Sequence, residues 1–236
     1  MGECQVKSIL SRGRFTLTSH TDFAIVRPMT DHLETELKFY LSGFETLRNR
    51  LPELGADRTD PNTLEYNVRY ETADERLRKT KCLLRLRKAR RTTLTFKSPP
   101  PTADSRFKTH RELEVKVDDF DALDAILQAL GFHRRQVYEK WRETWQLDAA
   151  TICLDTMPYG HFLEIEGQPD AIIAAVGKLG LSWHRRIIDT YLGMFEQMQK
   201  DEKLGFNDLT FANFQHVTID FDRYRPMFEA AGKPSR

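Results

Sequence analysis

At least six segments of the sequence alternate charged residues with apolar ones, one position at a time. The first, residues 32–41, reads HLETELKFYL and places Glu34, Glu36 and Lys38 at every second position, with leucine and phenylalanine in most of the positions between. A period of two is typical of a β-strand, whose successive side chains point to opposite faces of a sheet. The charged face of a single strand would normally face water. The same charged face, with charges of both signs, recurs in several segments, and this repetition constrains the fold much further.

Basic and acidic residues occupy the alternating positions of the later segments in the same way. The basic ones are Arg85 and Arg87 in CLLRLRKA, Lys97 in TTLTFKS, and Lys140 and Arg142 in VYEKWRETW. The acidic ones are Glu112 and Glu114 in RELEVKV, Asp155 in TICLDTM, and Glu164 and Glu166 in FLEIEG. The positions between them carry mainly Leu, Ile, Phe, Val and Trp, so each segment predicts a strand with one charged and one apolar face.

Three of these segments are followed by a helical pattern that ends in Leu-Gly, at residues 54–55, 130–131 and 179–180. Glycine commonly follows the end of a helix. The apolar positions that we expect to face the sheet are Phe44, Leu47, Leu51 and Leu54 in the first helix, Phe120, Leu123, Ile126, Leu127 and Leu130 in the second, and Ile172, Ile173, Val176 and Leu179 in the third. The strand–helix units form a degenerate repeat. A further amphipathic helix is predicted over residues 187–198.

The charged faces need a common interior if the helices cover the apolar faces, as two-layer packing requires. An antiparallel sheet that closes with its charged faces inward is a barrel with a wet, polar lumen. The lumen must be wet because sealing so many charges in a dry core would cost several kcal/mol for each unpaired ion. The predicted fold class is therefore α+β, a closed antiparallel β-barrel with helices packed outside.

The residues of the proposed lumen indicate what it binds. Lysine and arginine donors suit phosphate oxygens, and the basic set comprises Lys38, Arg85, Arg87, Lys97, Lys140 and Arg142. Carboxylates are hard oxygen ligands for Mg²⁺ or Mn²⁺, and the acidic set comprises Glu34, Glu36, Glu112, Glu114, Asp155, Glu164 and Glu166. Phosphate binding alone needs no acids, and metal binding alone needs no arginine row. Both sets together favour a polyphosphate bound with a divalent metal, as in phosphoryl transfer.

The segment Glu34-Thr35-Glu36-Leu37-Lys38 resembles the ExExK signature of the CYTH superfamily, the triphosphate tunnel metalloenzymes. That superfamily includes thiamine triphosphatases, inorganic triphosphatases and class IV adenylyl cyclases. Further segments are similar to the family's motifs in the family's order: RYETADERL, LLRLR, LTFKSP, the Lys140 and Arg142 pair, and FLEIEG. Arg69, Tyr70 and Glu71 depart from the family's Tyr, Phe and Asp, and we expect this change to alter the tunnel wall more than the chemistry.

The resemblance implies a barrel of eight strands and a set of roles. Glu34, Glu36, Glu164 and Glu166, assisted by Asp155, would hold one or two divalent ions, Mg²⁺ or Mn²⁺. The basic row would bind the phosphates of a triphosphate substrate, and Lys38 with Arg85 or Arg87 would stabilise the charge that develops during hydrolysis. The same site in a class IV adenylyl cyclase would convert ATP to cyclic AMP and pyrophosphate. A non-catalytic polyphosphate-binding module is a third reading, which the two complete Glu-x-Glu pairs disfavour.

Composition bounds the partners and the compartment. The chain has 36 basic and 35 acidic residues, a net charge of +1, and so no overall field that would draw it to nucleic acid or anionic lipid. The longest purely apolar run, residues 171–176, is too short for a membrane span. Three cysteines without CxxC spacing argue against a disulfide framework and a zinc site, and fit the cytoplasm. We expect a small-molecule triphosphate as the partner, with homodimer formation open.

The chain divides into three parts by its patterns. Residues 1–30 show no sustained period and are expected to be a flexible N-terminal extension or a start-site artefact, because Met29 directly precedes the first patterned segment. Residues 31–200 are expected to form the tunnel domain. Residues 201–236 are expected to form a weakly structured C-terminal tail that packs or frays.

Overall fold

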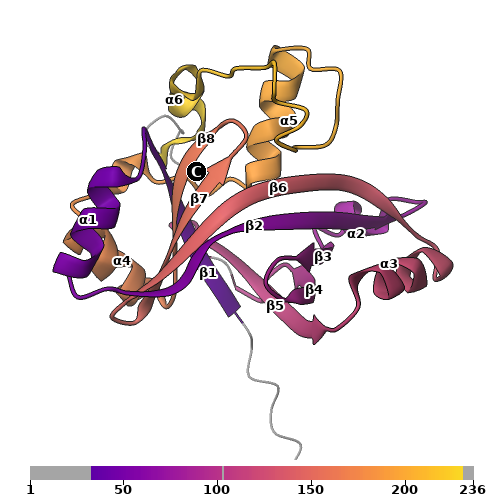
Figure 1. Ribbon diagram of the computed structural model, residues 1–236, viewed down its shortest axis with the longest axis horizontal. Helices are drawn as coiled ribbons and strands as arrows, with labels where there is room; N and C mark the ends of the chain where they lie inside the picture. The colour runs from indigo at the N-terminus through magenta and orange to yellow at the C-terminus, as the bar shows by residue number, and fades with distance from the viewer. Residues whose placement is uncertain (1–32, 103, 231–236) are drawn as a thin grey trace, which may run out of the picture. The chain divides into compact units, whose positions relative to one another are not determined.

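Eight antiparallel strands form a closed barrel in the computed structural model, in the order β1-β5-β4-β3-β2-β6-β7-β8 (Figure 1). The structure describes residues 33–102 and 104–230. The strands are β1 (Leu33–Leu41), β2 (Asp57–Thr72), β3 (Leu83–Lys88), β4 (Thr92–Ser98), β5 (Lys108–Val117), β6 (Phe132–Leu147), β7 (Ala150–Met157) and β8 (Gly160–Glu166). The ring closes because β1 pairs with both β5 and β8, so the closed antiparallel arrangement is confirmed. The predicted N-terminal extension lies outside the described residues.

Six helices and two 3₁₀ turns accompany the barrel in this part of the chain. The helices are α1 (Glu45–Glu53), α2 (Arg76–Lys79), α3 (Phe120–Ala129), α4 (Pro169–Lys178), α5 (Tyr191–Asp201) and α6 (Arg225–Phe228), and the turns are η1 (Trp183–Arg185) and η2 (Phe221–Arg223). The three predicted Leu-Gly helix ends are confirmed: Gly55, Gly131 and Gly180 have φ angles of +80°, +90° and +63°. This left-handed conformation is one that glycine adopts without steric cost.

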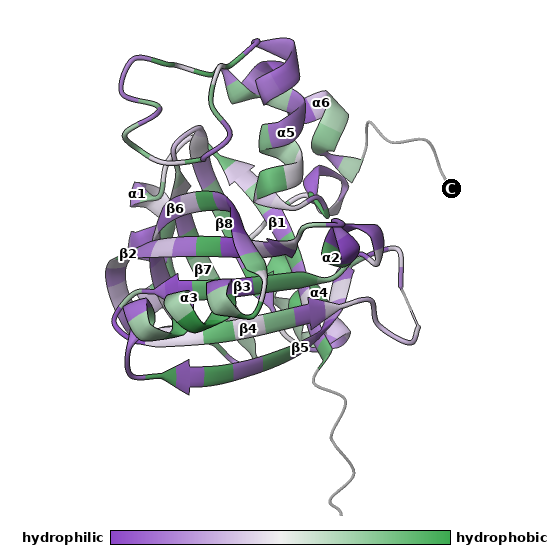
Figure 2. Ribbon diagram, turned by 90° about the vertical axis from the view of Figure 1, so that its right-hand side faces the viewer, coloured by the Kyte–Doolittle hydropathy of each residue, from purple (hydrophilic) through white to green (hydrophobic). Residues whose placement is uncertain are grey.

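The alternation of the sequence places apolar residues outside and charges inside. Figure 2 shows the alternation as bands of hydrophilic and hydrophobic colour along the strands. Outside, α4 packs against β1, β7 and β8, and Leu37, Ile165 and Ile172 are fully buried in the cluster between them. Residues directly opposite each other on paired strands share a face, and the register pairs Glu36 with Glu166 and Lys38 with Glu164. The charged faces of neighbouring strands therefore line up inside the ring.

Some helix positions predicted to face the sheet are exposed. Ile126 and Leu130 expose 53% and 70% of their surface, and Ile173 exposes 41%. The buried line of α3 runs instead through Phe120, Asp124 and Leu127. Asp124 turns inward because it accepts hydrogen bonds from the Tyr70 hydroxyl at 2.5 Å and from Arg134 Nε at 2.8 Å. The hydrogen bonds of Asp124 thus help to decide which face of α3 is buried, whereas periodicity considered only the apolar residues.

The helix predicted over residues 187–198 begins later, at Tyr191. Ile187 instead forms a β-bridge with Lys38, with Lys38 N–H donating to Ile187 O at 2.9 Å and Ile187 N–H donating to Lys38 O at 2.7 Å. The hydroxyl of Thr190 caps the helix by accepting from Gly193 N–H at 2.8 Å. The bridge therefore places the chain just before α5 beside Lys38 of β1.

The segment after α5 packs against the barrel in the part that the structure describes, up to residue 230. Leu209 and Phe221 are buried in a cluster with Phe195 of α5 and Phe162 of β8. Backbone bonds join it to the barrel, since Leu209 N–H donates to Val137 O at 2.9 Å. The described residues cluster as one compact unit. The buried aromatic residues explain the packing, because burying each removes a large apolar surface from water. Figure 1 shows α5 and α6 beside each other.

No helix among the described residues is long and apolar enough to cross a membrane.

Candidate metal and phosphate site

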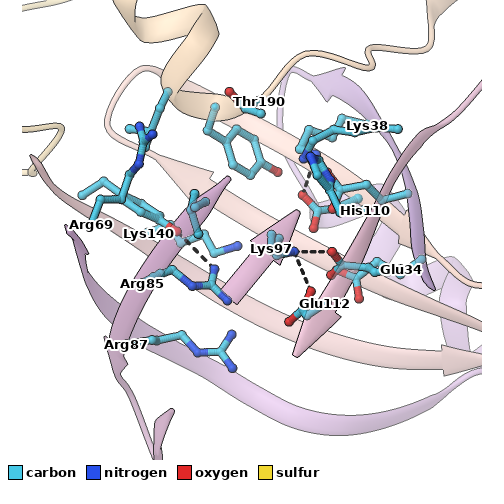
Figure 3. Close-up of a pocket in the computed structure, with 18 of the residues that line it drawn as sticks. Glu34, Lys38, Arg69, Arg85, Arg87, Lys97, His110, Glu112, Lys140 and Thr190 are labelled. Atoms are coloured by element: carbon cyan, nitrogen blue, oxygen red, sulfur yellow. Dashed lines mark hydrogen bonds and ion pairs between the residues drawn. The ribbon is translucent and has the colours of Figure 1, made fainter. Parts of the chain in front are cut away.

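The inward faces of the strands enclose a cavity of about 310 Å³ (Figure 3). The predicted site residues that line it are Glu34, Glu36, Lys38, Arg85, Arg87, Lys97, Glu112, Glu114, Lys140, Arg142, Glu164 and Glu166. They come from six of the eight strands and are far apart in the sequence. Closure of the barrel is what brings them together, because each strand contributes only its inward positions.

Three carboxylates converge at one place in the wall. Glu34, Glu36 and Glu166 each offer an oxygen, and these oxygens all lie within 4.8 Å of one another. Burial raises the pKa of Glu34, and Glu36 adds to the rise although Lys97 acts against it. Burial, and then the Glu164 carboxylate, raise the pKa of Glu166 well above its ordinary value. The ionised forms of Glu34 and Glu166 are therefore disfavoured where they stand, and a bound divalent cation would stabilise them. Its all-oxygen donors fit Mg²⁺ or Mn²⁺.

Lysines partly neutralise this acidic cluster, by which we mean Glu34, Glu36 and Glu166. Lys97 Nζ binds the Glu34 carboxylate, and Lys108 Nζ binds Glu36 Oε1 at 2.5 Å. Burial works to raise the pKa of Glu36, but the ammonium groups of Lys108 and Lys38 outweigh it and hold the pKa well below its usual range. Glu36 is thus an anion at all ordinary pH values.

Lys38 is a buried cation held between two carboxylates. Its Nζ binds Glu36 and lies 3.1 Å from Glu164 Oε2. Burial lowers the pKa of Lys38, but Glu164 and Glu36 raise it by more, so the ammonium stays protonated. Burial would raise the pKa of Glu164, yet Lys38 and Arg142 bring it well below its ordinary value. Glu164 is therefore an anion that pairs with Lys38 and Arg142, and it is not among the three carboxylates whose oxygens converge.

Two arginines of β3 form a second wall. Arg85 donates from Nη1 to the Tyr138 hydroxyl at 3.1 Å and from Nη2 to Thr95 Oγ1 at 3.2 Å. Its one carboxylate neighbour at ion-pair distance in the described structure is Glu114, at 3.9 Å. Arg87 reaches Glu114 at 3.3 Å and Glu65 at 3.4 Å. Neutral hydroxyls and long ion pairs fix these guanidinium groups while leaving donors for phosphate oxygens.

Asp155 and Glu114 lie apart from the acidic cluster. Asp155 faces inward as its strand position predicts, but it is fully buried and does not line the cavity. It accepts hydrogen bonds from Arg142 Nε at 2.6 Å, Lys140 Nζ at 3.0 Å and the Tyr191 hydroxyl at 2.8 Å. Its oxygens are thus taken by donors, and it positions two cations of the wall. Glu114 instead accepts from Thr95 Oγ1 at 2.9 Å beside the arginines.

The structure adds lining residues that the sequence reasoning missed. They include Lys108, His110, Tyr138, Tyr191 and Thr190. Arg69, which was expected to affect the tunnel wall, also lines the cavity. The period of two could have found Lys108 and His110, because they continue the inward positions of Glu112 and Glu114 on β5. Burial, followed by Lys108 and Lys97, lowers the pKa of His110 to about 4. Tyr191 had no such signal, since it enters the cavity from a helix.

The family model of the CYTH domain matches residues 32–186. The chain belongs to the CYTH domain family. The match ends before α5, so α5 and the segment that follows it lie outside the matched region. No curated protein sequence matches the chain significantly.

Solved structures share the fold. A Vibrio parahaemolyticus protein named as a candidate adenylate cyclase has a TM-score of 0.62 at 20% identity, covering 70% of this chain and 98% of that one. A Pyrococcus horikoshii protein has a TM-score of 0.57 at 28% identity, covering 70% and 99%. A Hippeastrum protein, named as a candidate adenylyl cyclase and described as having a dominant triphosphatase activity, has a TM-score of 0.50 at 14% identity, covering 70% and 96%.

Proposed function

We propose that this CYTH-family protein is a divalent-metal-dependent phosphohydrolase that acts on a triphosphate held inside the barrel. The observation that carries the proposal is the meeting of the acidic cluster with a wall of arginine and lysine donors in one cavity. Inorganic tripolyphosphate, thiamine triphosphate and nucleoside triphosphates all offer the required chain of three phosphates. The Hippeastrum neighbour, described as a triphosphatase, supports the same reaction class.

Glu34, Glu36 and Glu166 would hold the cation, Mg²⁺ or Mn²⁺. Such an ion, when bound, supplies charge that polarises the phosphoryl group and offsets the negative oxygens of the substrate. The separation of roles follows from the geometry. Cationic side chains contact both groups, but the carboxylate oxygens converge only in the acidic cluster, and Glu164 and Asp155 are not part of that convergence among the described residues. The terminal phosphate of the substrate would therefore lie beside Glu34 and Glu36.

The basic residues of the chain bind and orient the phosphates. Arg85 and Arg87 offer forked donors to non-bridging oxygens, and Lys38 supplies a cation that stays protonated. Water attacks the terminal phosphorus, the bridging phosphorus–oxygen bond breaks, and its electron pair stays on the leaving oxygen. The products are orthophosphate and a chain shorter by one phosphate. Preorganised donors stabilise the charge that develops on the oxygens, which is commonly the largest contribution to such catalysis.

One set of incubations tests the proposal against its rivals. The full chain is incubated with Mg²⁺ or Mn²⁺ and, separately, with tripolyphosphate, thiamine triphosphate and ATP, and orthophosphate, pyrophosphate and cyclic AMP are measured. We expect orthophosphate, with no turnover in EDTA. The Vibrio parahaemolyticus neighbour is named as a candidate cyclase, and cyclic AMP with pyrophosphate would contradict the hydrolase proposal in favour of a class IV adenylyl cyclase. Tight binding without product would indicate a polyphosphate-binding module.

A further inference from the structure

A second cavity of about 240 Å³ adjoins the main one and shares Arg69 and Leu83 with it. Its walls come from β2 and α2, from the start of β6, and from α5. Figure 3 shows Arg69 at the opposite side of the main cavity from Glu34 and Glu112. A phosphate chain that starts at the acidic cluster and passes Arg85 would therefore reach the second cavity at Arg69.

Arg69 is a largely buried cation with little to balance it. It pairs across the sheet with Arg85 on one side and with Gln136 on the other. Its guanidinium makes one hydrogen bond in the described part of the chain, from Nη1 to Gln136 Oε1 at 3.2 Å, and no ion pair there. Burial lowers the pKa of Arg69 and Arg135 adds to the fall, although Tyr138, Glu196 and Glu71 act against it. An anionic ligand would satisfy its free donors.

The remaining charges of the second cavity also favour an anion. Arg78, Arg135 and Lys200 line it, as do the carboxylates Glu71 and Glu196. Outside this lining, Glu75 pairs with Arg78 at 2.5 Å and with Arg135 at 3.9 Å. The Glu71 carboxylate is already engaged, because it accepts hydrogen bonds from the backbone N–H groups of Thr72, Leu77 and Arg78 at 2.8 to 2.9 Å. With Arg69, the four cations that line this cavity still outnumber its two lining carboxylates, Glu71 and Glu196.

The neutral lining does not suit a heteroaromatic ring. Amide side chains dominate it: Gln136, Gln199 and Asn207. Tyr70 is the aromatic residue of this lining, and it is 3% exposed, with its hydroxyl bound to Asp124 outside the barrel. A nucleobase or thiamine ring would find no open aromatic face for stacking. Amide and guanidinium donors instead match phosphate oxygens.

We propose that the second cavity binds a fourth phosphate group, beyond the three in the main cavity, and that Arg69 is the residue that contacts it. This inference rests on the proposed function for the placement of the first three phosphates. The fourth phosphate belongs to a longer inorganic chain or to a nucleoside tetraphosphate. Arg69 is then a specificity residue for chain length.

Binding of phosphate chains tests this directly. Tripolyphosphate, tetrapolyphosphate, ATP and adenosine 5′-tetraphosphate are titrated into the full-length protein by calorimetry, in EDTA and again with Mg²⁺, and KM and kcat are measured alongside. The variants are Arg69→Met, which removes the charge at similar length, and Arg69→Lys, which keeps it. Arg91→Met is the matched control, because Arg91 is exposed and lines neither cavity.

We expect tetrapolyphosphate to bind about tenfold more tightly than tripolyphosphate, the scale of one charge-assisted contact. Arg69→Met should abolish the difference by weakening tetrapolyphosphate alone, Arg69→Lys should restore part of it, and Arg91→Met should leave it intact. A gain for adenosine 5′-tetraphosphate over ATP, also lost in Arg69→Met, would show that a nucleoside can follow the fourth phosphate. Its absence, with the inorganic gain present, would restrict the site to inorganic chains.

Three results would overturn the inference. They are equal affinity for three and four phosphates, an equal loss for both in Arg69→Met, and a loss of ATP affinity as large as that of tetrapolyphosphate. Each leaves the proposed function standing if orthophosphate is still released. Conversely, chain-length-dependent binding without any product would contradict the proposed hydrolase and support the inference. No binding of any phosphate chain would contradict both.

Discussion

The carboxylates on β1 and β8 and the arginines on β3 face the same cavity but are stabilised differently. In the acidic cluster, burial and neighbouring carboxylates raise the pKa of Glu34 and Glu166. On the arginine wall, hydroxyl groups and more distant carboxylates hold Arg85 and Arg87. One wall therefore carries buried carboxylates that lysines neutralise only in part, and the other carries donors fixed in place. The difference suits a cation on one side and its anionic substrate on the other.

The largest expected effect comes from removing an acid of the cluster. Glu166→Gln should lower kcat/KM by about a thousandfold, because the site for the cation loses one of three charged ligands. In metal-free protein the same change should raise the melting temperature or leave it unchanged, since it removes a carboxylate whose ionised form burial and Glu164 disfavour. Mg²⁺ should stabilise the wild type but not the variant, as measured by thermal unfolding. Unchanged activity would refute the metal assignment.

On the arginine wall, a carboxylate should matter for stability instead. Burial works to raise the pKa of Glu65, but Lys140, Arg142 and Arg87 together lower it to about 2. The folded state thus holds the proton less tightly than the unfolded chain, so Glu65 adds about 3 kcal/mol of stability above pH 4.5. Glu65→Gln should lose this amount at pH 7 in urea unfolding. The difference between the two proteins should shrink as the pH falls from 4.5 towards 2, and a constant difference would contradict the assignment.

A smaller effect should follow from changing the shape of a donor while keeping its charge. Arg85→Lys should weaken tripolyphosphate binding about tenfold, because an ammonium cannot hold Tyr138 and Thr95 while also presenting a fork to phosphate. KM is the measurement, with Arg91→Lys as the exposed control. Equal KM values for wild type and Arg85→Lys would show that this wall acts by charge alone.

The smallest effect should come from a carboxylate on the arginine wall. Glu114→Gln should change kcat/KM by no more than about threefold, because the Glu114 side chain is 35% exposed and lies outside the acidic cluster. The stabilisation by Mg²⁺ should persist in this variant. A loss as large as that of Glu166→Gln would remove the distinction between the two walls.

The sequence could predict which charged side chains point inward, but not which of them line the open cavity and which are buried beyond it. The period of two placed Asp155 on the same inward face as the site residues. In the folded chain its strand position pairs with Phe162, and Tyr191 packs against the Phe162 ring at 5.3 Å between centroids. The end of the lumen around Asp155 is thus filled by aromatic side chains. Which end is filled depends on the register of β7 and on a helix that lies beyond the alternating segments.

The buried face of helix α3 is a second feature that the sequence pattern could not fully predict. Periodicity marked Leu127 and Leu130 alike, yet Leu127 is 5% exposed and Leu130 is 70% exposed. The hydrogen bonds of Asp124 to Tyr70 and Arg134 select the buried line of α3, and they join residues that are 54 and 10 positions apart from it. A pattern within one helix carries no information about such partners.

The sequence by itself determined the positions and charged faces of β1 and of β3 to β8, and the ExExK-like motif that indicates the family, but it did not mark β2 as a strand. These properties are local, because a strand alternates its side chains whatever lies beside it. Only the tertiary structure decided which carboxylates converge, which are bound by cationic side chains, and that Arg69 joins the main cavity to a second one. Those outcomes depend on barrel closure and strand register, which bring together residues more than a hundred positions apart.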